Sequence, residues 1–573
     1  MKKFAMLTVK GAVGLVPKAV RNKLKNNHKL TELYSRSLQR SGLFYGFPSE
    51  KKRMALYKNY LEHQKRVINH SADGNKSSFE FTYIILGHKN ISVSLASLKE
   101  TTNGKGDILV VTEKQLGANI SCYSSIAEAV SSLDDNKALF FLNSGDSITN
   151  EWVNVFTKNH READLIYCDT DTYDAKKRRV SPHFLPDWNP ELQYSTGYIS
   201  TGVKCKAEII KENNVKSSTI AGLVAELWVK QPKLLIKHLP YTLLHRTTNN
   251  DVVHKSLADI RERLSKYTST VPSFNSELGV NCIQWPIFSE PLVSLIIPTK
   301  NAKNLVKACI ESIIEKTIYQ NYEILLIDNG SDEKESLDYF ETLNQHPKVK
   351  VLRYPGEFNY SAINNFGVQR ASNKASIVGL VNNDIEVISP NWLDSMVGHA
   401  IREDIGCVGA KLLYSDGRIQ HAGVVLGYGG GAGHAHKYFP RYHPGYLKRL
   451  MATQNYSAVT AACLLVKKSL FLEVGGLNEQ DLAVAFNDVD FCLRVKETGV
   501  RNVYCAEAEL YHHESVSRGL DHAPEKAARF NRELSYLKAK WGSYIEHDPA
   551  YSPNLTLKRE NFSVKEKDEL VFR

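Results

Sequence analysis

Short apolar runs alternate along most of the chain with longer stretches whose apolar residues recur at helical spacing. The runs are rich in β-favouring residues and polar turns follow them, which predicts buried strands separated by helices. The clearest runs cover residues 79–86, 107–112, 138–146, 293–301, 323–330 and 378–384. This order predicts an α/β fold with a parallel sheet covered by helices on both faces.

The same succession of runs occurs twice, and a tryptophan follows the third run in each copy, Trp152 and Trp392. An internal repeat of this length predicts two α/β domains in tandem. We place their bounds as follows: a basic helical N-terminal segment at 1–78, a first domain at 79–245, a linker at 246–290, a second domain at 291–545 and a C-terminal tail at 546–573. The tail contains prolines and lysines and is expected to be loosely ordered.

The run at 378–384 ends in Asn382, Asn383 and Asp384. In open α/β sheets, ligands bind at the carboxyl ends of the strands. A carboxylate at that edge can hold a divalent cation together with a diphosphate. The alternative for this stretch alone is a strand that ends in an Asx turn.

The net charge of +11 favours anionic partners such as nucleotides, acidic lipid headgroups or nucleic acid. The nine cysteines form no CxxC pair, which argues against a zinc knuckle and a disulfide framework and indicates a reducing, cytoplasmic location. Apolar runs of about 18 residues are missing, so we expect no spanning helix. Residues 2–29 mix basic and apolar side chains, which suits either peripheral contact with the inner face of the cytoplasmic membrane or a solvated helix.

Seven motifs stand in register over the second copy: 293–301, 327–332, 358–367, 380–384, 474–478, 486–494 and 510–519. Together they resemble the family 2 glycosyltransferases of the GT-A fold, and most closely the rhamnosyltransferase-like group of bacterial O-antigen and polysaccharide enzymes. The resemblance implies two tandem GT-A domains, which are Rossmann-like nucleotide-diphospho-sugar transferase domains, with the first degenerate. It also implies an inverting enzyme that moves a sugar from a nucleotide-diphosphate donor to a hydroxyl of a growing cell-surface glycan.

The resemblance assigns roles to residues at the strand ends. Asp384 matches the last carboxylate of the family's metal motif, and His512 matches a histidine that completes the metal or diphosphate site, with His513 in reserve. The metal is expected to be manganese or magnesium. Asp328 matches a base- or ribose-binding carboxylate, and an Asx turn is the less favoured alternative. The residues expected to bind the nucleotide sugar are Pro298, Thr299, Asn301, Asp328, Asn365, Asn382 and Asn383.

Transfer to an alcohol requires a general base, because a hydroxyl is a weak nucleophile until its proton is removed. Asp488 matches the family's base at the start of a helix, and Asp490, two residues later, is the second candidate catalytic residue. The competing explanation is that both acids simply meet the positive end of the helix dipole. A nucleic-acid partner would explain the charge but none of the motifs, so we expect none.

A glycine-rich loop at 427–436 and the aromatic, basic stretch at 438–446 suit sugar stacking and diphosphate contact. His434 and His436 within them form either a metal site or a solvated, substrate-facing pair. In the first domain, residues 143–146 stand at the metal-motif position, but counterparts of Asp488 and His512 are not evident.

We therefore expect the first domain to be a non-catalytic module that supports the second domain or holds the acceptor; a second active site is the alternative. The expected partners of the whole chain are a dTDP- or UDP-sugar and a lipid-linked oligosaccharide acceptor. Rhamnose is favoured by the resemblance alone. The alternative function is a catalytically silent sugar- or nucleotide-binding module of a polysaccharide assembly complex.

Overall fold

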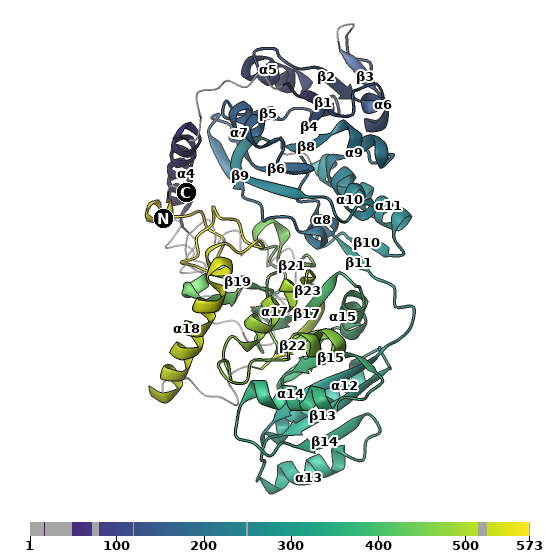
Figure 1. The fold of residues 1–573 in the computed structure, drawn as a ribbon, viewed down its shortest axis with the longest axis vertical. Helices are drawn as coiled ribbons and strands as arrows, with labels where there is room; N and C mark the ends of the chain where they lie inside the picture. The colour runs from purple at the N-terminus through teal and green to yellow at the C-terminus, as the bar shows by residue number, and fades with distance from the viewer. Residues whose placement is uncertain are drawn as a thin grey trace.

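The computed structural model describes residues 17, 48–70, 80–117, 120–247, 250–513 and 524–571. Two α/β domains are stacked along the long axis of the molecule, and helix α4 (Glu50–His70) lies with the C-terminal segment on one side of them (Figure 1). The basic segment at 2–29 lies outside the described residues except for Pro17.

The first domain is built on a sheet with the strand order β3-β2-β1-β4-β8-β6-β9-β5, and β7 pairs with β6 at one side. Its core is dominated by strands that are buried on both faces, such as β1 and β4. The strands are β1 (Thr82–Leu86), β2 (Ile108–Val111), β3 (Ser121–Tyr123), β4 (Ala138–Asn143), β5 (Ser147–Ile148), β6 (Leu165–Tyr173), β7 (Arg179–His183), β8 (Val203–Lys206) and β9 (Ile236–His245).

The second domain has the matching order β14-β13-β12-β15-β22-β17-β23-β16, with β18 paired to β17 and β21 to β23. The strands are β12 (Leu292–Thr299), β13 (Tyr322–Asp328), β14 (Val349–Arg353), β15 (Ala375–Val381), β16 (Ile385–Val387), β17 (Ile405–Leu413), β18 (Ile419–His421), β21 (Gln454–Asn455), β22 (Cys463–Lys467) and β23 (Arg501–His512). A separate ribbon joins β19 (Val424–Leu426) to β20 (Ala432–His434).

The two sheets agree strand for strand in order and in direction, which confirms the predicted α/β fold and the repeat. Trp152 and Trp392 are both fully buried and begin equivalent helices. The expectation of a purely parallel sheet is wrong, because β8 and β22 run antiparallel to their neighbours. The chain reaches β22 from the carboxyl edge of the sheet, where Cys463 pairs with Val381, and therefore runs back along the sheet.

Helices pack on both faces of each sheet (Figure 1). In the first domain they are α5 (Ile91–Thr101), α6 (Ile126–Ser131), α7 (Trp152–Asn159), α8 (Pro190–Thr196), α9 (Ala207–Glu212) and α10 (Ile220–Lys230). In the second they are α12 (Lys303–Lys316), α13 (Lys334–Leu343), α14 (Tyr360–Arg370), α15 (Trp392–Ala400), α16 (Lys468–Glu473) and α17 (Asn487–Glu497), and α18 (Pro524–Glu546) lies beside them. Between the sheets come α11 (Asn250–Tyr267) and a hairpin of β10 (Val271–Asn275) and β11 (Val280–Gln284); Leu264 and Ile260 of α11 pack against Ala221 and Ala225 of α10.

The domain interface is polar and specific. Asn189 accepts from the backbone N–H of Asn455 at 2.9 Å and donates to its carbonyl at 2.8 Å. Nearby, buried Glu191 of α8 pairs with Arg402 of the second domain at 2.9 Å. A buried carboxylate such as that of Glu191 is costly unless a cation is paired with it. These contacts therefore favour one arrangement of the two domains.

The C-terminal tail is packed, and the expectation of loose order is wrong. Tyr551, Leu555 and Phe562 are almost fully buried. Asn554 donates to Asp169 of the first domain at 2.9 Å, and Asp187 N–H donates to the carbonyl of Pro549 at 2.9 Å. Proline and lysine content misled the prediction, because the apolar residues between them supply the contacts.

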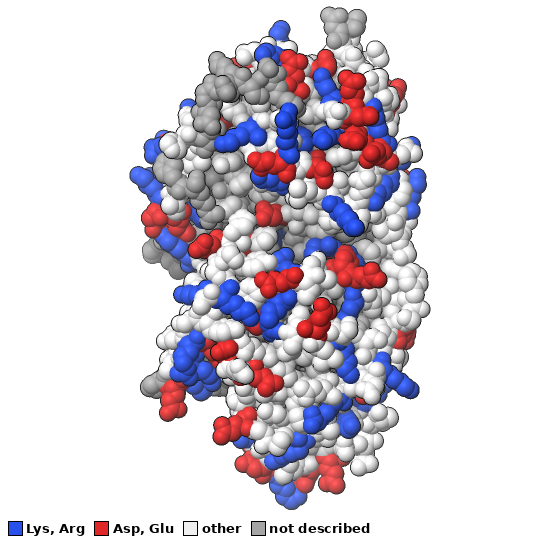
Figure 2. Space-filling view, viewed as in Figure 1, with Lys and Arg blue, Asp and Glu red and all other residues white. Residues whose placement is uncertain are grey.

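Charge is distributed without one dominant basic face in the view of Figure 2, where Lys and Arg alternate with Asp and Glu over both domains. Within the residues that the structure describes, we find no helix long and apolar enough to cross a membrane.

Candidate active site

The carboxyl ends of β12, β13 and β15 meet at one edge of the second sheet. Thr299 ends β12, Asp328 ends β13, and Asn382-Asn383-Asp384 follows β15. Asn383 Nδ2 donates to Thr299 Oγ1 at 2.9 Å and so joins the first and third of these strands. Because this edge is the ligand-binding edge of open α/β sheets, these side chains form the floor of the candidate site.

Asp328 makes the turn contact that was one of its two explanations. Its Oδ1 accepts from Ser331 N–H at 2.9 Å and from Ser331 Oγ at 2.5 Å, which is a turn contact, while Oδ2 pairs with Arg353 Nη1. Arg353 ends β14, and its side chain is 56% exposed. Sequence reasoning missed this arginine, which presents a cation beside the second strand end.

Three other residues that were predicted to bind the nucleotide sugar lie within the fold and contact the protein itself. Asn301 accepts from the N–H groups of Asp332 and Glu333 at 3.0 and 3.1 Å, and its φ of 53° places it in the left-handed region. Asn365 accepts from Leu477 N–H at 2.8 Å and donates back to its carbonyl. Pro298 lies within β12. Asn365 thus joins α14 to the segment at 477–479.

Asp384 and His512 lie side by side, with Oδ1 and Nε2 3.1 Å apart. His512 Nδ1 donates to Gln420 Oε1 at 2.7 Å, so Nε2 carries the lone pair and accepts from Asn382 Nδ2 at 3.1 Å. Gln420 is buried in β18 and was not predicted. A hydrogen bond to the far ring nitrogen is how proteins orient metal-binding histidines.

The pair fits a divalent cation, because a carboxylate oxygen and an imidazole lone pair face one point from neighbouring strand ends. Two protein ligands are few. Among the described residues, no group of three or more His, Cys, Asp or Glu side chains forms a metal cluster. Such a site suits an ion that is also bound by the phosphates of a substrate.

Asp488 lies in the first turn of α17 and is linked to the Asp384–His512 pair through Ala461, Tyr360 and Asn382. Phe486 before it has a φ of 59°, a strained conformation that turns the chain into the helix. Asp488 Oδ2 accepts from Ala461 N–H at 3.1 Å, and Tyr360 OH reaches both the Ala461 carbonyl, at 3.2 Å, and Asn382 Oδ1, at 3.0 Å. Burial raises the pKa of the Asp488 carboxyl. Tyr360 thus connects the candidate base to the candidate metal-binding stretch, a link that sequence reasoning did not find.

Asp490 points away from these residues. It is fully buried and accepts from Arg494 at 2.8 Å, Trp541 at 2.9 Å and Lys540 at 3.0 Å. Two residues along a helix place the side chain on a different face, where Asp490 joins α17 to α18. We therefore leave Asp490 out of the candidate catalytic set.

The remaining histidines divide clearly. The ring of His513 is hydrogen-bonded to Ser415 Oγ at 2.7 Å and to Glu386 at 3.1 Å, and not to the side chain of Asp384. His436 is buried, accepts from Tyr446 N–H at 3.1 Å and stacks on Phe562, so the solvated alternative is wrong for His436. Burial lowers the pKa of both His434 and His436, which keeps them neutral.

A pair of aromatic rings lies close to this edge. Tyr414 directly follows β17, and its ring stacks on that of Tyr438 with centroids 5.0 Å apart. Tyr438 is 40% exposed, and Arg418 lies over its ring. The neighbouring residue Ser415 contacts His513, which places the stacked pair near the end of β23.

The equivalent edge of the first domain is closed. Asp146 is buried and accepts from Thr201 Oγ1 at 2.7 Å and from Thr247 N–H at 2.7 Å. In the strand register, His245 of β9 lies opposite Ser147 of β5, just as His512 of β23 lies opposite Ile385 of β16. A counterpart of His512 therefore exists, contrary to expectation. Its ring bonds Asp171 at 2.5 Å instead of Asp146. The first turn of α10 contains no acid to match Asp488.

Comparison with known proteins gives matches over the second domain and beyond it. The profile of glycosyl transferase family 2 matches residues 294–475. The uncharacterized protein y4gI of Sinorhizobium fredii is 43% identical over 422 residues, which cover 70% of this chain and 46% of that protein. The O-antigen biosynthesis protein RfbC of Myxococcus xanthus is 31% identical over 428 residues, covering 71% of this chain and 32% of RfbC.

A third relative is the N-acetylglucosaminyl-diphospho-decaprenol L-rhamnosyltransferase of Mycobacterium tuberculosis, which is 25% identical over 231 residues, 37% of this chain and 74% of the enzyme. The chain thus spans less than half the length of the first two relatives.

Proposed function

Because residues 294–475 form a family 2 glycosyltransferase domain, we propose that the chain is an inverting glycosyltransferase. It moves a sugar from a nucleotide-diphosphate donor to a hydroxyl of a lipid-linked oligosaccharide, in the assembly of a cell-surface glycan. The observation that carries the proposal is the chain of contacts at one sheet edge, from Asp384 and His512 through Asn382, Tyr360 and Ala461 to Asp488.

The donor lies across the ends of β12, β13 and β15. Arg353, with its exposed side chain, supplies positive charge near the nucleotide, and Asp328 holds it in place. Asp384 and His512 would hold manganese or magnesium, which supplies positive charge to the leaving diphosphate. The relatives named for O-antigen biosynthesis and rhamnosyl transfer favour a rhamnose donor such as a dTDP-sugar.

Asp488 acts as the general base on the acceptor side. The carboxylate removes the hydroxyl proton as the new glycosidic bond forms and the bond to the diphosphate breaks on the opposite face, which inverts the anomeric centre. Its raised pKa makes it a stronger base than an exposed aspartate. The stacked Tyr414 and Tyr438 offer an aromatic face to the acceptor sugar.

The first domain has a supporting role, since its Asp146 is enclosed by threonines. The basic segment at 2–29 brings the protein to the inner face of the cytoplasmic membrane, where lipid-linked acceptors are found.

The test is release of nucleoside diphosphate from a panel of dTDP-, UDP- and GDP-sugars with Mn²⁺, Mg²⁺ or EDTA. Metal-dependent release from one donor, lost in Asp384→Ala and Asp488→Asn, is the expected result. Nucleotide binding without release from any donor, even with lipid-linked acceptor present, would instead favour a silent binding module.

A further inference from the structure

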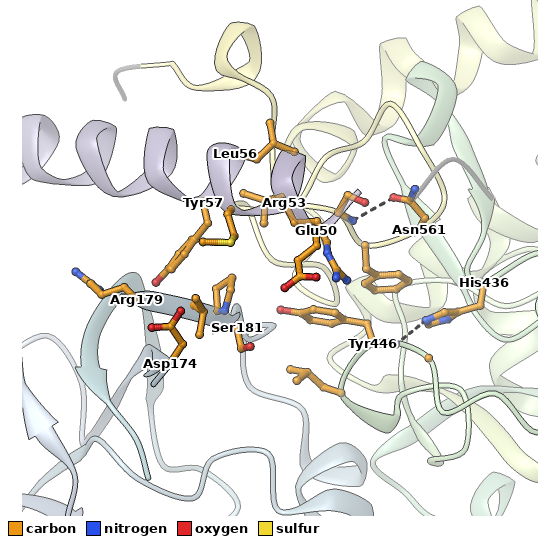
Figure 3. A pocket seen from close by; sticks show the side chains of 18 of the residues that line it. Glu50, Arg53, Leu56, Tyr57, Asp174, Arg179, Ser181, His436, Tyr446 and Asn561 are labelled. Carbon is orange, nitrogen blue, oxygen red and sulfur yellow. Dashed lines mark hydrogen bonds between the residues drawn. The ribbon is translucent and has the colours of Figure 1, made fainter. Parts of the chain in front are cut away.

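A cavity of about 470 Å³ lies where the two domains, α4 and the C-terminal tail meet (Figure 3). Its walls come from α4, from the β6–β7 hairpin of the first domain, from the 436–447 loop of the second domain and from tail residues 561–564. None of the three strand ends that form the candidate active site contributes to its lining. The volume is within the range of about 300–1,000 Å³ that is usual for small-molecule sites.

The walls of the cavity are firmly held. Tyr57 of α4 donates to buried Asp171 at 2.5 Å, and Tyr446 OH bonds both the N–H and the carbonyl of Phe184 across the domain interface. Phe562 of the tail stacks between His436, at 4.4 Å, and Tyr446, at 5.5 Å. These hydrogen bonds and ring contacts hold the lining side chains in place and so determine the shape of the cavity.

Several lining residues have unfavourable backbone geometry. Ser181, His436, Leu447 and Phe562 have φ values of 51°, 57°, 50° and 54° although none is glycine. Such conformations are strained in residues other than glycine, and strain of this kind gathers at functional sites. A space-filling junction between domains does not by itself require it.

The charges of the lining are balanced. Arg179 is paired with Asp171, and Arg178 with Asp174. The two histidines are neutral, because burial lowers the pKa of His443 to about 4 and that of His436 below its usual range. What remains is one exposed acid and one exposed base on the first turn of α4, Glu50 and Arg53, for which the described part of the chain records no ion pair.

This chemistry selects a class of ligand. A nucleotide or a lipid phosphate would need an excess of positive charge, which the lining lacks. A sugar ring instead packs its apolar face on an aromatic ring. Its hydroxyls both donate and accept hydrogen bonds, so the site must offer donors and acceptors. Tyr446 supplies a half-buried ring beside the nearly buried rings of Tyr57 and Phe439, and Glu50 and Arg53 supply a carboxylate and a guanidinium.

We propose that this cavity binds an uncharged saccharide segment of the growing glycan, at a distance from the point of transfer. The inference rests on the proposed function. The loop that lines the cavity also leads to the active site: His434 lies against His421, whose Nε2 accepts from Thr460 N–H at 3.3 Å. A segment held there would keep the glycan bound between successive additions.

The experiment measures binding of uncharged bacterial O-polysaccharide fragments, freed of lipid and sorted by length, to the full-length protein by isothermal titration. The double variant Glu50→Ala/Arg53→Ala removes the two exposed polar groups, and Met54→Trp fills the cavity from α4. Lys51→Ala, an exposed change on the same turn outside the cavity, is the matched control. Donor-only release of nucleoside diphosphate is measured on each protein in parallel.

We expect wild type and Lys51→Ala to bind fragments equally, and both cavity variants to bind at least roughly tenfold more weakly with donor-only release unchanged. Equal binding by all four proteins, or no binding by a wild type that releases nucleoside diphosphate, would overturn the cavity proposal. Fragment binding lost in the cavity variants without any donor release would instead contradict the proposed function and leave the saccharide site supported.

Discussion

Two acids that are two residues apart on α17 should respond to substitution in opposite ways. Asp490 is fully buried among Arg494, Lys540 and Trp541, whereas Asp488 accepts from Ala461 N–H at the sheet edge. We predict that Asp490→Ala lowers stability and that Asp488→Asn lowers turnover by orders of magnitude without lowering stability.

The size of the first effect follows from the contacts. Removing one partner of a buried ion pair costs about 3–5 kcal/mol. The lower end applies here, because Arg494 also donates to the carbonyls of Val474 and Gly476, and because the Lys540 side chain is 35% exposed and its pair is screened by solvent. A loss of about 3 kcal/mol in a domain of this size lowers the unfolding temperature by about 6–12 °C.

The second effect follows from the pKa. Burial raises the pKa of Asp488 above its unfolded value, so its contribution to stability is complete at low pH and is lost as pH rises through the folded pKa. At neutral pH the uncharged amide introduced by Asp488→Asn should therefore be tolerated at least as well as the carboxylate. Loss of a general base should lower turnover by about 10²–10⁴-fold.

Thermal unfolding by circular dichroism and nucleoside diphosphate release are measured on both variants and on wild type. Asp490→Ala is expected to keep its turnover at a temperature where it is folded. The reasoning would be refuted by an Asp490→Ala protein of wild-type stability that has lost turnover, or by an Asp488→Asn protein that turns over normally.

Four further outcomes are expected. Gln420→Leu should raise the Mn²⁺ concentration for half-maximal activity by about 10–100-fold, because His512 loses the partner that orients it; an unchanged metal titration would argue against His512 as a ligand. Tyr438→Ala should raise the acceptor KM by up to about tenfold, the worth of an aromatic contact, and a change in donor-only release would count against a role in acceptor binding. Asp146→Asn should leave turnover unchanged, and its loss would reveal a second active site. Plots of kcat/KM against pH should fall on the acidic side with an apparent pKa above that of an ordinary aspartate, about 3.9, because Asp488 must be ionised to accept a proton; a limb at or below that value would contradict the assignment.

Sequence patterns predicted the features that depend on periodicity and local order. The duplicated succession of strands, the buried tryptophans Trp152 and Trp392, and the position of Asp384 after a buried strand all follow from hydrophobic runs and the residues that end them. Asp488 and His512 were chosen by resemblance, and the structure brings His512 beside Asp384.

Contacts between distant segments were not predictable in this way. Tyr360, Gln420 and Arg353 reach the site from elements whose proximity is decided by strand order. Tyr360 lies within the motif at 358–367, but the motif does not say what its hydroxyl contacts, and Gln420 and Arg353 lie outside every motif. Asp490 was chosen for its neighbour, but helical geometry turns it to another face. The tail was judged by its prolines, while Tyr551 and Phe562 determine its packing.

The most direct test of the account is mass spectrometry of a lipid-linked oligosaccharide after incubation with the protein, metal and the donor that supports nucleotide release. Wild type should add the mass of one sugar residue or more, and Asp488→Asn should add none while still binding the nucleotide. Tight donor binding by wild type with no gain in acceptor mass, across donors and acceptors, would contradict the claim that this edge of the second domain performs sugar transfer.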